Sequence, residues 1–131
     1  MRKEELIGNA MAAMKNAYAP YSKFTVGSAL LGKSGKVYFG CNVENSSFGA
    51  TGCAERGAFS SAVAHGEKDF YAIAIVGGKG GRVEKYCPPC GICRQIMSEF
   101  CNKDFKVYLY NGVEIKTYTL GELLPESFDL R

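Results

Sequence analysis

The first third of the chain places its apolar residues first at helical and then at strand spacing. From Leu6 to Tyr18 they recur every three or four positions, which predicts a helix that ends before Pro20. Residues 24–31 (FTVGSALL) and 36–44 (KVYFGCNVE) have the pattern of strands and flank a glycine-containing turn. We therefore expect a helix followed by two joined strands.

The rest of the chain alternates the two spacings again. A helix is expected from about residue 53, with Gly66 ending it, and a buried strand follows at residues 70–77. A second internal helix at residues 91–101 begins after two prolines, and residues 105–111 have the pattern of a further strand.

A capping box is expected near the C-terminus, because Thr119 and Glu122 have the right spacing for one before a short helix through Leu124. The expected order is therefore α-β-β-α-β-α-β and a short tail. This alternation favours an α/β sheet with helices packed against it, in one domain spanning residues 1–131. Residues 77–86 are expected to form a flexible loop, without the Gly-Lys-Ser/Thr sequence of a phosphate-binding loop.

Composition narrows the classes of function. Hydrophobic residues make up 47% of the chain and charged residues 22%, as in ordinary globular proteins. The N-terminal apolar residues are spaced rather than continuous, and no apolar run could cross a bilayer, so we expect a cytoplasmic protein without a membrane partner. There, six cysteines favour metal binding or catalysis over disulfides. A net charge of +3 argues weakly against a nucleic-acid partner.

The cysteines supply the candidate chemistry. In the segment YCPPCGICRQ, Cys90 and Cys93 share one face at the start of a predicted helix, whereas Cys87 lies outside it before two prolines. Cys53 begins the other internal helix, and helix N-termini stabilise thiolates. We expect these three residues, Cys53, Cys90 and Cys93, to bind Zn²⁺. Cys101 lies roughly 12 Å along the helix from Cys93 and is expected in the core.

Three ligands leave one coordination position open, which is typical of a catalytic zinc site where water is activated. Glu55 points roughly 200° around the helix from Cys53, so we expect it to handle protons there rather than bind the metal. The alternative is an ordinary first-turn acid that complements the helix dipole. His65, the only histidine, is expected to be a helix C-terminal residue.

The negative charge of three thiolates suggests a role for two arginines. Arg56 and Arg94 each share a helix face with a cysteine ligand, and our hypothesis is that one or both donate hydrogen bonds to sulfur. The alternative for each is a solvated surface arginine, which is about equally well supported for Arg94.

The sequence CAER followed by PPCGICRQ resembles the Cys-Ala-Glu…Pro-Cys-x-x-Cys signature of zinc nucleoside and base deaminases. Together with FTVGSALL, GCNVENSSFGATGCAERGAF and LGELLPESF, it makes nearly the whole chain similar to the small, homotetrameric, all-cysteine cytidine deaminases. The resemblance implies a three-layer α/β/α fold with a mixed, largely five-stranded sheet and one Zn²⁺ per subunit. It also implies hydrolytic deamination of cytidine and 2′-deoxycytidine, with release of ammonia, as part of pyrimidine salvage.

The resemblance also assigns contacts to the nucleoside within one subunit. Glu55 would transfer protons at the pyrimidine, and Phe24 would lie against the ring. Asn42 and Glu44 would hold the ribose hydroxyls, and the backbone at Ala54 would contact the base carbonyl.

Further contacts implied by the resemblance come from neighbouring subunits of a homotetramer with shared active sites. Phe128 would reach a neighbour's pocket, and Phe48 with Ala50 would approach from a neighbour. The alternative for Phe24 and Phe128 is a place in the core. Phe48 stands where relatives often have tyrosine, so any hydrogen bond from that hydroxyl is absent.

Four rival functions remain open at this stage. A blasticidin S deaminase shares the zinc motif, although NVEN favours a nucleoside substrate. A deaminase of tRNA or DNA bases would be expected to carry more positive charge. A non-enzymatic zinc module would need a fourth ligand, and none is evident. A redox dithiol at Cys87 and Cys90 would leave Cys53, Cys93 and Glu55 without a role. Oxidation could still join Cys87 to Cys90 by a disulfide and inactivate the enzyme.

Overall fold

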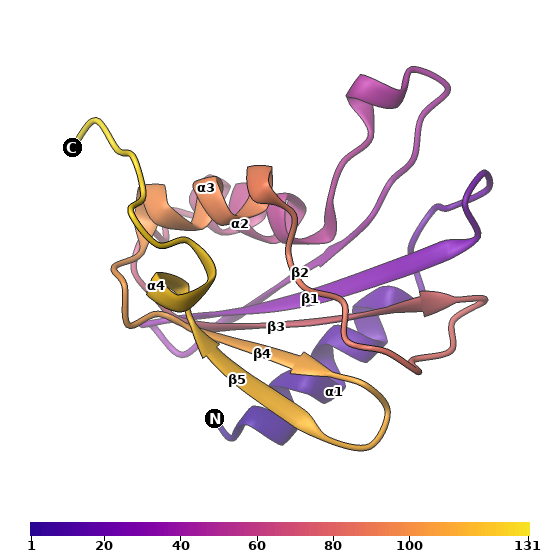
Figure 1. Ribbon diagram of the computed structural model, residues 1–131, viewed down its shortest axis with the longest axis horizontal. Helices are drawn as coiled ribbons and strands as arrows, with labels where there is room; N and C mark the ends of the chain where they lie inside the picture. Colours follow the sequence, from indigo (N-terminus) through magenta and orange to yellow (C-terminus); the bar gives the residue numbers. More distant parts are fainter.

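The computed structural model describes residues 1–131 (Figure 1). The elements follow the chain in the order α1 (Lys3–Met14), β1 (Phe24–Gly32), β2 (Val37–Cys41), the 3₁₀ turn η1 (Phe48–Ala50), α2 (Ala54–Ala64), β3 (Phe70–Lys79), α3 (Gly91–Phe100), β4 (Lys106–Tyr110), β5 (Ile115–Thr119) and α4 (Leu120–Leu123). No helix is long and apolar enough to span a membrane.

The strands form one five-stranded sheet in the order β2-β1-β3-β4-β5. Strands β3 and β4 are parallel, with Ile73 opposite Val107, and the other neighbours are antiparallel. Helix α1 covers one face of the sheet, and α2 and α3 cover the other (Figure 1). The expected three-layer α/β/α fold with a mixed sheet is thereby confirmed.

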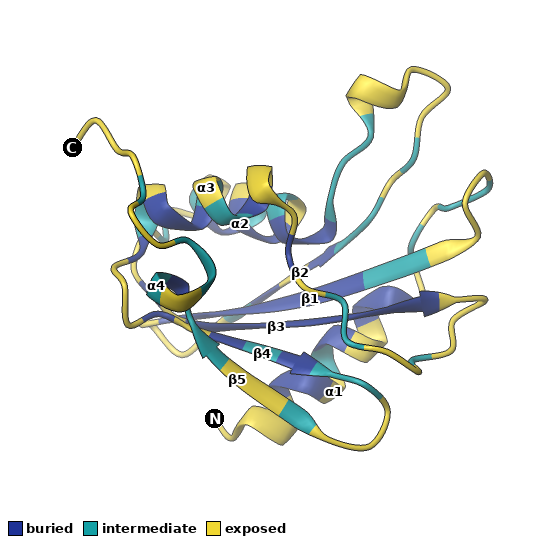
Figure 2. Cartoon of the chain, in the orientation of Figure 1, coloured by how far each residue is buried: buried dark blue, intermediate teal, exposed yellow.

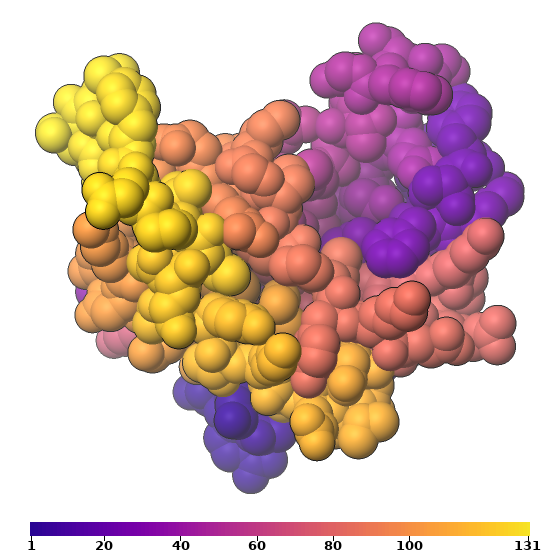
Figure 3. All heavy atoms as spheres, viewed as in Figure 1, coloured from indigo at the N-terminus to yellow at the C-terminus, as the bar shows by residue number.

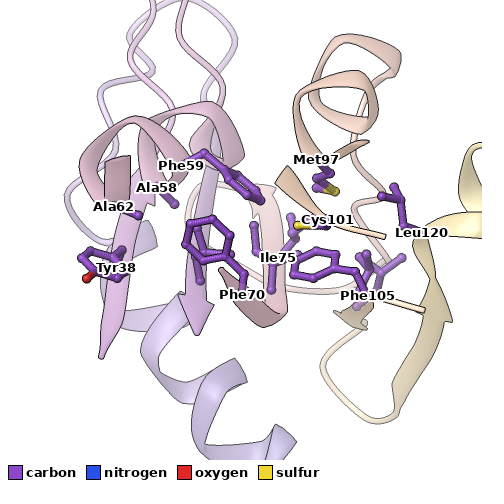
Figure 4. Packing of buried hydrophobic residues seen from close by; sticks show 14 residues of the cluster. Tyr38, Ala58, Phe59, Ala62, Phe70, Ile75, Met97, Cys101, Phe105 and Leu120 are labelled. Atoms are coloured by element: carbon purple, nitrogen blue, oxygen red, sulfur yellow. The ribbon is translucent and has the colours of Figure 1, made fainter. Parts of the chain in front are cut away.

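Alternation along the strands divides the core between the two helical layers. Ala29 and Leu31 of β1 pack toward α1, whereas Leu30 between them packs toward α2, because successive side chains point to opposite faces. The buried residues lie along the central strands and on the sides of the helices that face the sheet (Figure 2). The larger cluster, between the sheet and α2 and α3, is built around Phe59, Ile75 and Met97 (Figure 4). Cys101 lies in this cluster, as expected.

The structure differs from the predictions at several points. Helix α1 ends at Met14, earlier than the apolar pattern to Tyr18 suggested. Strand β2 ends at Cys41, so Asn42 and Glu44 lie in the segment after it instead of alternating along a strand. Strand β3 continues to Lys79, so the beginning of the expected 77–86 loop is strand. Strand β5 had no predicted counterpart, because it is an edge strand with intermediate or exposed residues and lacks an apolar pattern. The capping box of Thr119 and Glu122 is confirmed.

A bare glycine brings α2 close to the sheet. A Cβ atom built on Gly40 in β2 would lie 2.0 Å from the carbonyl oxygen of Ala54 and 2.7 Å from the nitrogen of Ala58. The same carbonyl accepts a hydrogen bond of 2.8 Å from the buried hydroxyl of Ser28 in β1. The first turn of α2 is therefore fixed against two strands at once.

We expect Gly40→Ala to lower the free energy of unfolding by about 1–3 kcal/mol, because the added methyl group overlaps the α2 backbone. Urea unfolding of the purified chain measures this. Gly8→Ala in α1 is the matched control, since a Cβ there meets nothing within 4 Å. That change should raise stability by up to about 1 kcal/mol. A Gly40→Ala chain as stable as the wild type would contradict the close approach.

Candidate active site

Two helix N-termini bring three cysteines together. Cys53 is the N-cap of α2, Cys90 is the N-cap of α3, and Cys93 lies in the first turn of α3. Their Sγ atoms all lie within 4.8 Å of one another. The Sγ atoms of Cys53 and Cys90 are 3.9 Å apart. The sequence-predicted trio therefore converges at one point.

The spacing of these sulfur atoms fits a zinc ion. With Zn–S bonds of about 2.3 Å and tetrahedral angles, two sulfur ligands are separated by about 3.8 Å. Thiolates are soft donors that favour Zn²⁺, and the partial positive charge of a helix N-terminus favours the thiolate form. Burial raises the pKa of the Cys53 and Cys93 thiols, so a metal that binds them must displace their protons.

Glu55 lies directly beside the three cysteines. Only 5% of its surface is exposed, and burial raises the pKa of its carboxyl group. The backbone N–H of Glu55 and the neighbouring Cys93 side chain lower the pKa of this carboxyl group, but less than burial raises it. A buried carboxyl with a raised pKa can both take up and release a proton, as a general acid–base requires.

Comparisons with known proteins identify the family of this site. Residues 1–109 match the model of the cytidine and deoxycytidylate deaminase zinc-binding region. The chain belongs to this deaminase family. A cytidine deaminase of Sporosarcina psychrophila is 48% identical over 95% of this chain and 90% of its own length. The crystal structure of a cytidine deaminase from Burkholderia pseudomallei has a TM-score of 0.89 and 45% identity, covering 98% of this chain and 100% of that one.

A relative with another substrate in its name is more distant. A blasticidin-S deaminase of Bacillus cereus is 34% identical over 82% of this chain and 79% of its own length. This chain is thus similar to relatives named for different substrates.

Asn42 and Glu44 form hydrogen bonds with the segment that leads into β1 and with the start of that strand. The Asn42 amide accepts a hydrogen bond from the backbone N–H of Val26 (2.8 Å) and donates one to the carbonyl of Phe24 (2.8 Å). The Glu44 carboxylate accepts hydrogen bonds from the backbone N–H groups of Tyr21 (2.9 Å) and Ser22 (3.2 Å), and from the Ser22 hydroxyl. The Ser22 hydroxyl lowers the pKa of Glu44 more than any other group.

Phe24 lies at the start of β1 with 40% of its surface exposed, so it is not a core residue. A Cβ built on Gly77 would lie 3.1 Å from the Phe24 ring and 2.9 Å from the Sγ of Cys87. Cys87 is therefore a neighbour of Phe24, although it is outside the three-sulfur cluster. Burial and, to a smaller extent, the charges of Glu55 and Cys53 together raise the pKa of the Cys87 thiol to about 11. Sequence spacing alone did not place Cys87 against Phe24.

The residues expected to serve neighbouring subunits lie in exposed segments of the chain. Phe48 is 82% exposed and Ala50 is also exposed, on a loop that projects beyond the helical layer. Phe128 is 69% exposed in the C-terminal tail. The two projections stand on opposite sides of the molecule (Figure 3). None of these three residues belongs to the cluster of Cys53, Cys90 and Cys93.

Both arginines contact backbone carbonyls. Arg56 donates a hydrogen bond of 2.7 Å to the carbonyl of Thr51. Arg94 donates to the carbonyls of Pro89 (2.8 Å) and Leu123 (2.7 Å). These bonds fix the segments just before Cys53 and Cys90, so in this structure the arginines support the cysteines through the backbone. The hypothesis of hydrogen bonds to sulfur stays a prediction.

We expect Cys53→Ser to lower the zinc content from about one ion per chain to a small fraction, because two thiolates bind zinc far more weakly than three. Elemental analysis after dialysis against a mild chelator measures this. Cys41→Ser is the matched control, since Cys41 is also partly exposed but outside the cluster. Equal zinc retention by the two variants would contradict the assignment of Cys53 as a ligand.

Proposed function

We propose that this chain, as one domain spanning residues 1–131, catalyses the hydrolysis of cytidine and 2′-deoxycytidine to uridine and 2′-deoxyuridine with release of ammonia. The observation that carries the proposal is a buried acid, Glu55, beside three converging thiols, Cys53, Cys90 and Cys93. The relatives named as cytidine deaminases support it through their identity and coverage. The more distant blasticidin-S deaminase makes that substrate the runner-up.

The proposed chemistry assigns the metal to the three cysteines and the protons to Glu55. Zinc, when bound there, supplies a Lewis acid that lowers the pKa of water toward about 7. Glu55 would accept one proton of the water, whose oxygen bonds to C4 of the ring, and deliver that proton to N3. It would then take the remaining proton of this oxygen and pass it to the amino nitrogen, so that the C–N bond breaks, ammonia leaves and the oxygen becomes the carbonyl of uridine. The burial of Glu55 keeps solvent water from competing for these protons.

The hydrogen bonds of Asn42 and Glu44 leave positions free on both side chains for a sugar hydroxyl of the nucleoside. A carboxylate offers about four acceptor positions, and three on Glu44 are occupied by Tyr21 and Ser22. An amide group has two donor hydrogens, and Asn42 gives one to Phe24. The Asn42 carbonyl oxygen accepts only from Val26, so one acceptor position is left on each residue, together with one donor hydrogen on Asn42. A sugar hydroxyl can accept from that donor and donate to either acceptor. Ribose and 2′-deoxyribose share such a hydroxyl, so both nucleosides fit.

The remaining contacts are proposed to come from the assembly. Phe24 would lie against the pyrimidine, and the backbone at Ala54 would contact the base carbonyl. We infer that Phe48, Ala50 and Phe128 complete sites in neighbouring subunits of a homotetramer, because the two phenylalanine rings are largely exposed and Ala50 lies in the same exposed turn as Phe48.

We expect Glu55→Gln to retain zinc but to lose about 10²–10⁴-fold in kcat, because the amide cannot exchange protons with the substrate. Loss of ultraviolet absorbance on mixing with cytidine measures turnover, and elemental analysis measures zinc. Full activity of a zinc-loaded Glu55→Gln chain would remove the proton-transfer role.

We expect kcat/KM for cytidine and 2′-deoxycytidine to differ by no more than about tenfold, because the hydroxyl that both sugars share can pair with Asn42 and Glu44 in either nucleoside. For 2′,3′-dideoxycytidine, kcat/KM should fall at least about a hundredfold, because it leaves the donor and acceptor unpaired. Preference for blasticidin S over cytidine in the same assay would favour the runner-up function.

A further inference from the structure

The turn before β1 has a strained backbone. Lys23 has φ of 61°, in the left-handed region that residues other than glycine seldom adopt. Its N–H donates to the carbonyl of Ala19 (3.1 Å), and its own carbonyl accepts from Gly80 (2.9 Å). Such backbone persists where surrounding contacts hold it in place, and it often occurs at binding sites.

One hydroxyl joins this turn to both ends of the proposed nucleoside site. The Ser22 Oγ donates a hydrogen bond to Oε2 of Glu44 and accepts one from the backbone N–H of Phe24 (3.0 Å). It thereby links the side chain proposed to bind the sugar with the residue proposed to contact the base. Ser22 itself has no assigned contact with the substrate.

The bond to Glu44 also determines which acceptor position is left for the sugar. Two backbone N–H groups occupy Oε1 of Glu44, and the Ser22 hydroxyl occupies one position on Oε2. Rotation about the last side-chain bond of a glutamate is otherwise only weakly restricted. With the hydroxyl present, the unused position has a defined direction before any sugar arrives.

We propose that Ser22 is a positioning residue that orients Glu44 and Phe24 together, so that sugar and base are bound by a preformed site. This inference rests on the proposed function. Removing the hydroxyl should make the positions of Glu44 and Phe24 less well defined. The three cysteines and Glu55 lie on other elements and should keep their places. Binding should therefore weaken without a matching loss in the chemical step.

The chain contains a matched control at the other end of β1. The Ser34 hydroxyl donates to the Glu67 carboxylate, Ser34 N–H donates to the same carboxylate, and Ser34 Oγ accepts from the N–H of Lys36. This is the same set of hydrogen bonds as at Ser22, in a turn that contains none of the proposed site residues. Ser34→Ala removes equivalent bonds and reports the purely structural cost.

The test compares Ser22→Ala, Ser22→Thr and Ser34→Ala in the zinc-loaded, full-length enzyme. We expect Ser22→Ala to raise KM for cytidine about tenfold with kcat within about twofold, the loss expected for one or two hydrogen bonds. Ser34→Ala should leave both constants near wild type, and Ser22→Thr should restore KM because it keeps a hydroxyl. The dissociation constant of the product uridine should rise in parallel with KM.

Two results would overturn the inference while the function stands. In the first, the wild type is active and Ser22→Ala and Ser34→Ala raise KM by equal factors. In the second, Ser22→Thr raises KM as much as Ser22→Ala does. A zinc-loaded wild type that does not deaminate cytidine would instead overturn the proposed function itself. Thermal unfolding of the two alanine variants verifies that their folding losses are similar.

Discussion

The approach of two helix N-termini to one point is the constraint on which the rest of the molecule depends. Helices α2 and α3 lie on the same face of the sheet and place Cys53, Cys90 and Cys93 within 4.8 Å of one another. The close contact at Gly40 and the hydrogen bond from Ser28 fix the start of α2 against β1 and β2. Without that contact the sulfur atoms would not share one metal, and Glu55 would be an ordinary first-turn acid.

The site has two parts that differ in how they are supported. The metal ligands and Glu55 are carried by helix starts packed on the sheet. The proposed base and sugar contacts are carried by loops around the start of β1 and the end of β2, which hydrogen bonds to Asn42 and Glu44 hold in place. Rigid support therefore lies where bonds would be broken, and hydrogen-bonded loops lie where a nucleoside must enter and leave.

Local rules predicted much of this arrangement. Helical spacing predicted that Cys90 and Cys93 share a face, and the capping box of Thr119 and Glu122 was identified from two residues. Contacts between distant segments could not be predicted in this way. The partners of Ser22, the carbonyl contacts of Arg56 and the proximity of Cys87 to Phe24 depend on which segments the sheet order brings together. Strand β5 was missed because edge strands have little apolar pattern.

X-ray absorption at the zinc edge of the purified, active chain tests the central claim most directly. The account predicts about three sulfur neighbours near 2.3 Å and one lighter oxygen neighbour, as a site with three thiolates and one open position requires. Four sulfur neighbours, with Cys87 completing a closed structural site, would contradict it, as would a fully active chain that contains no zinc.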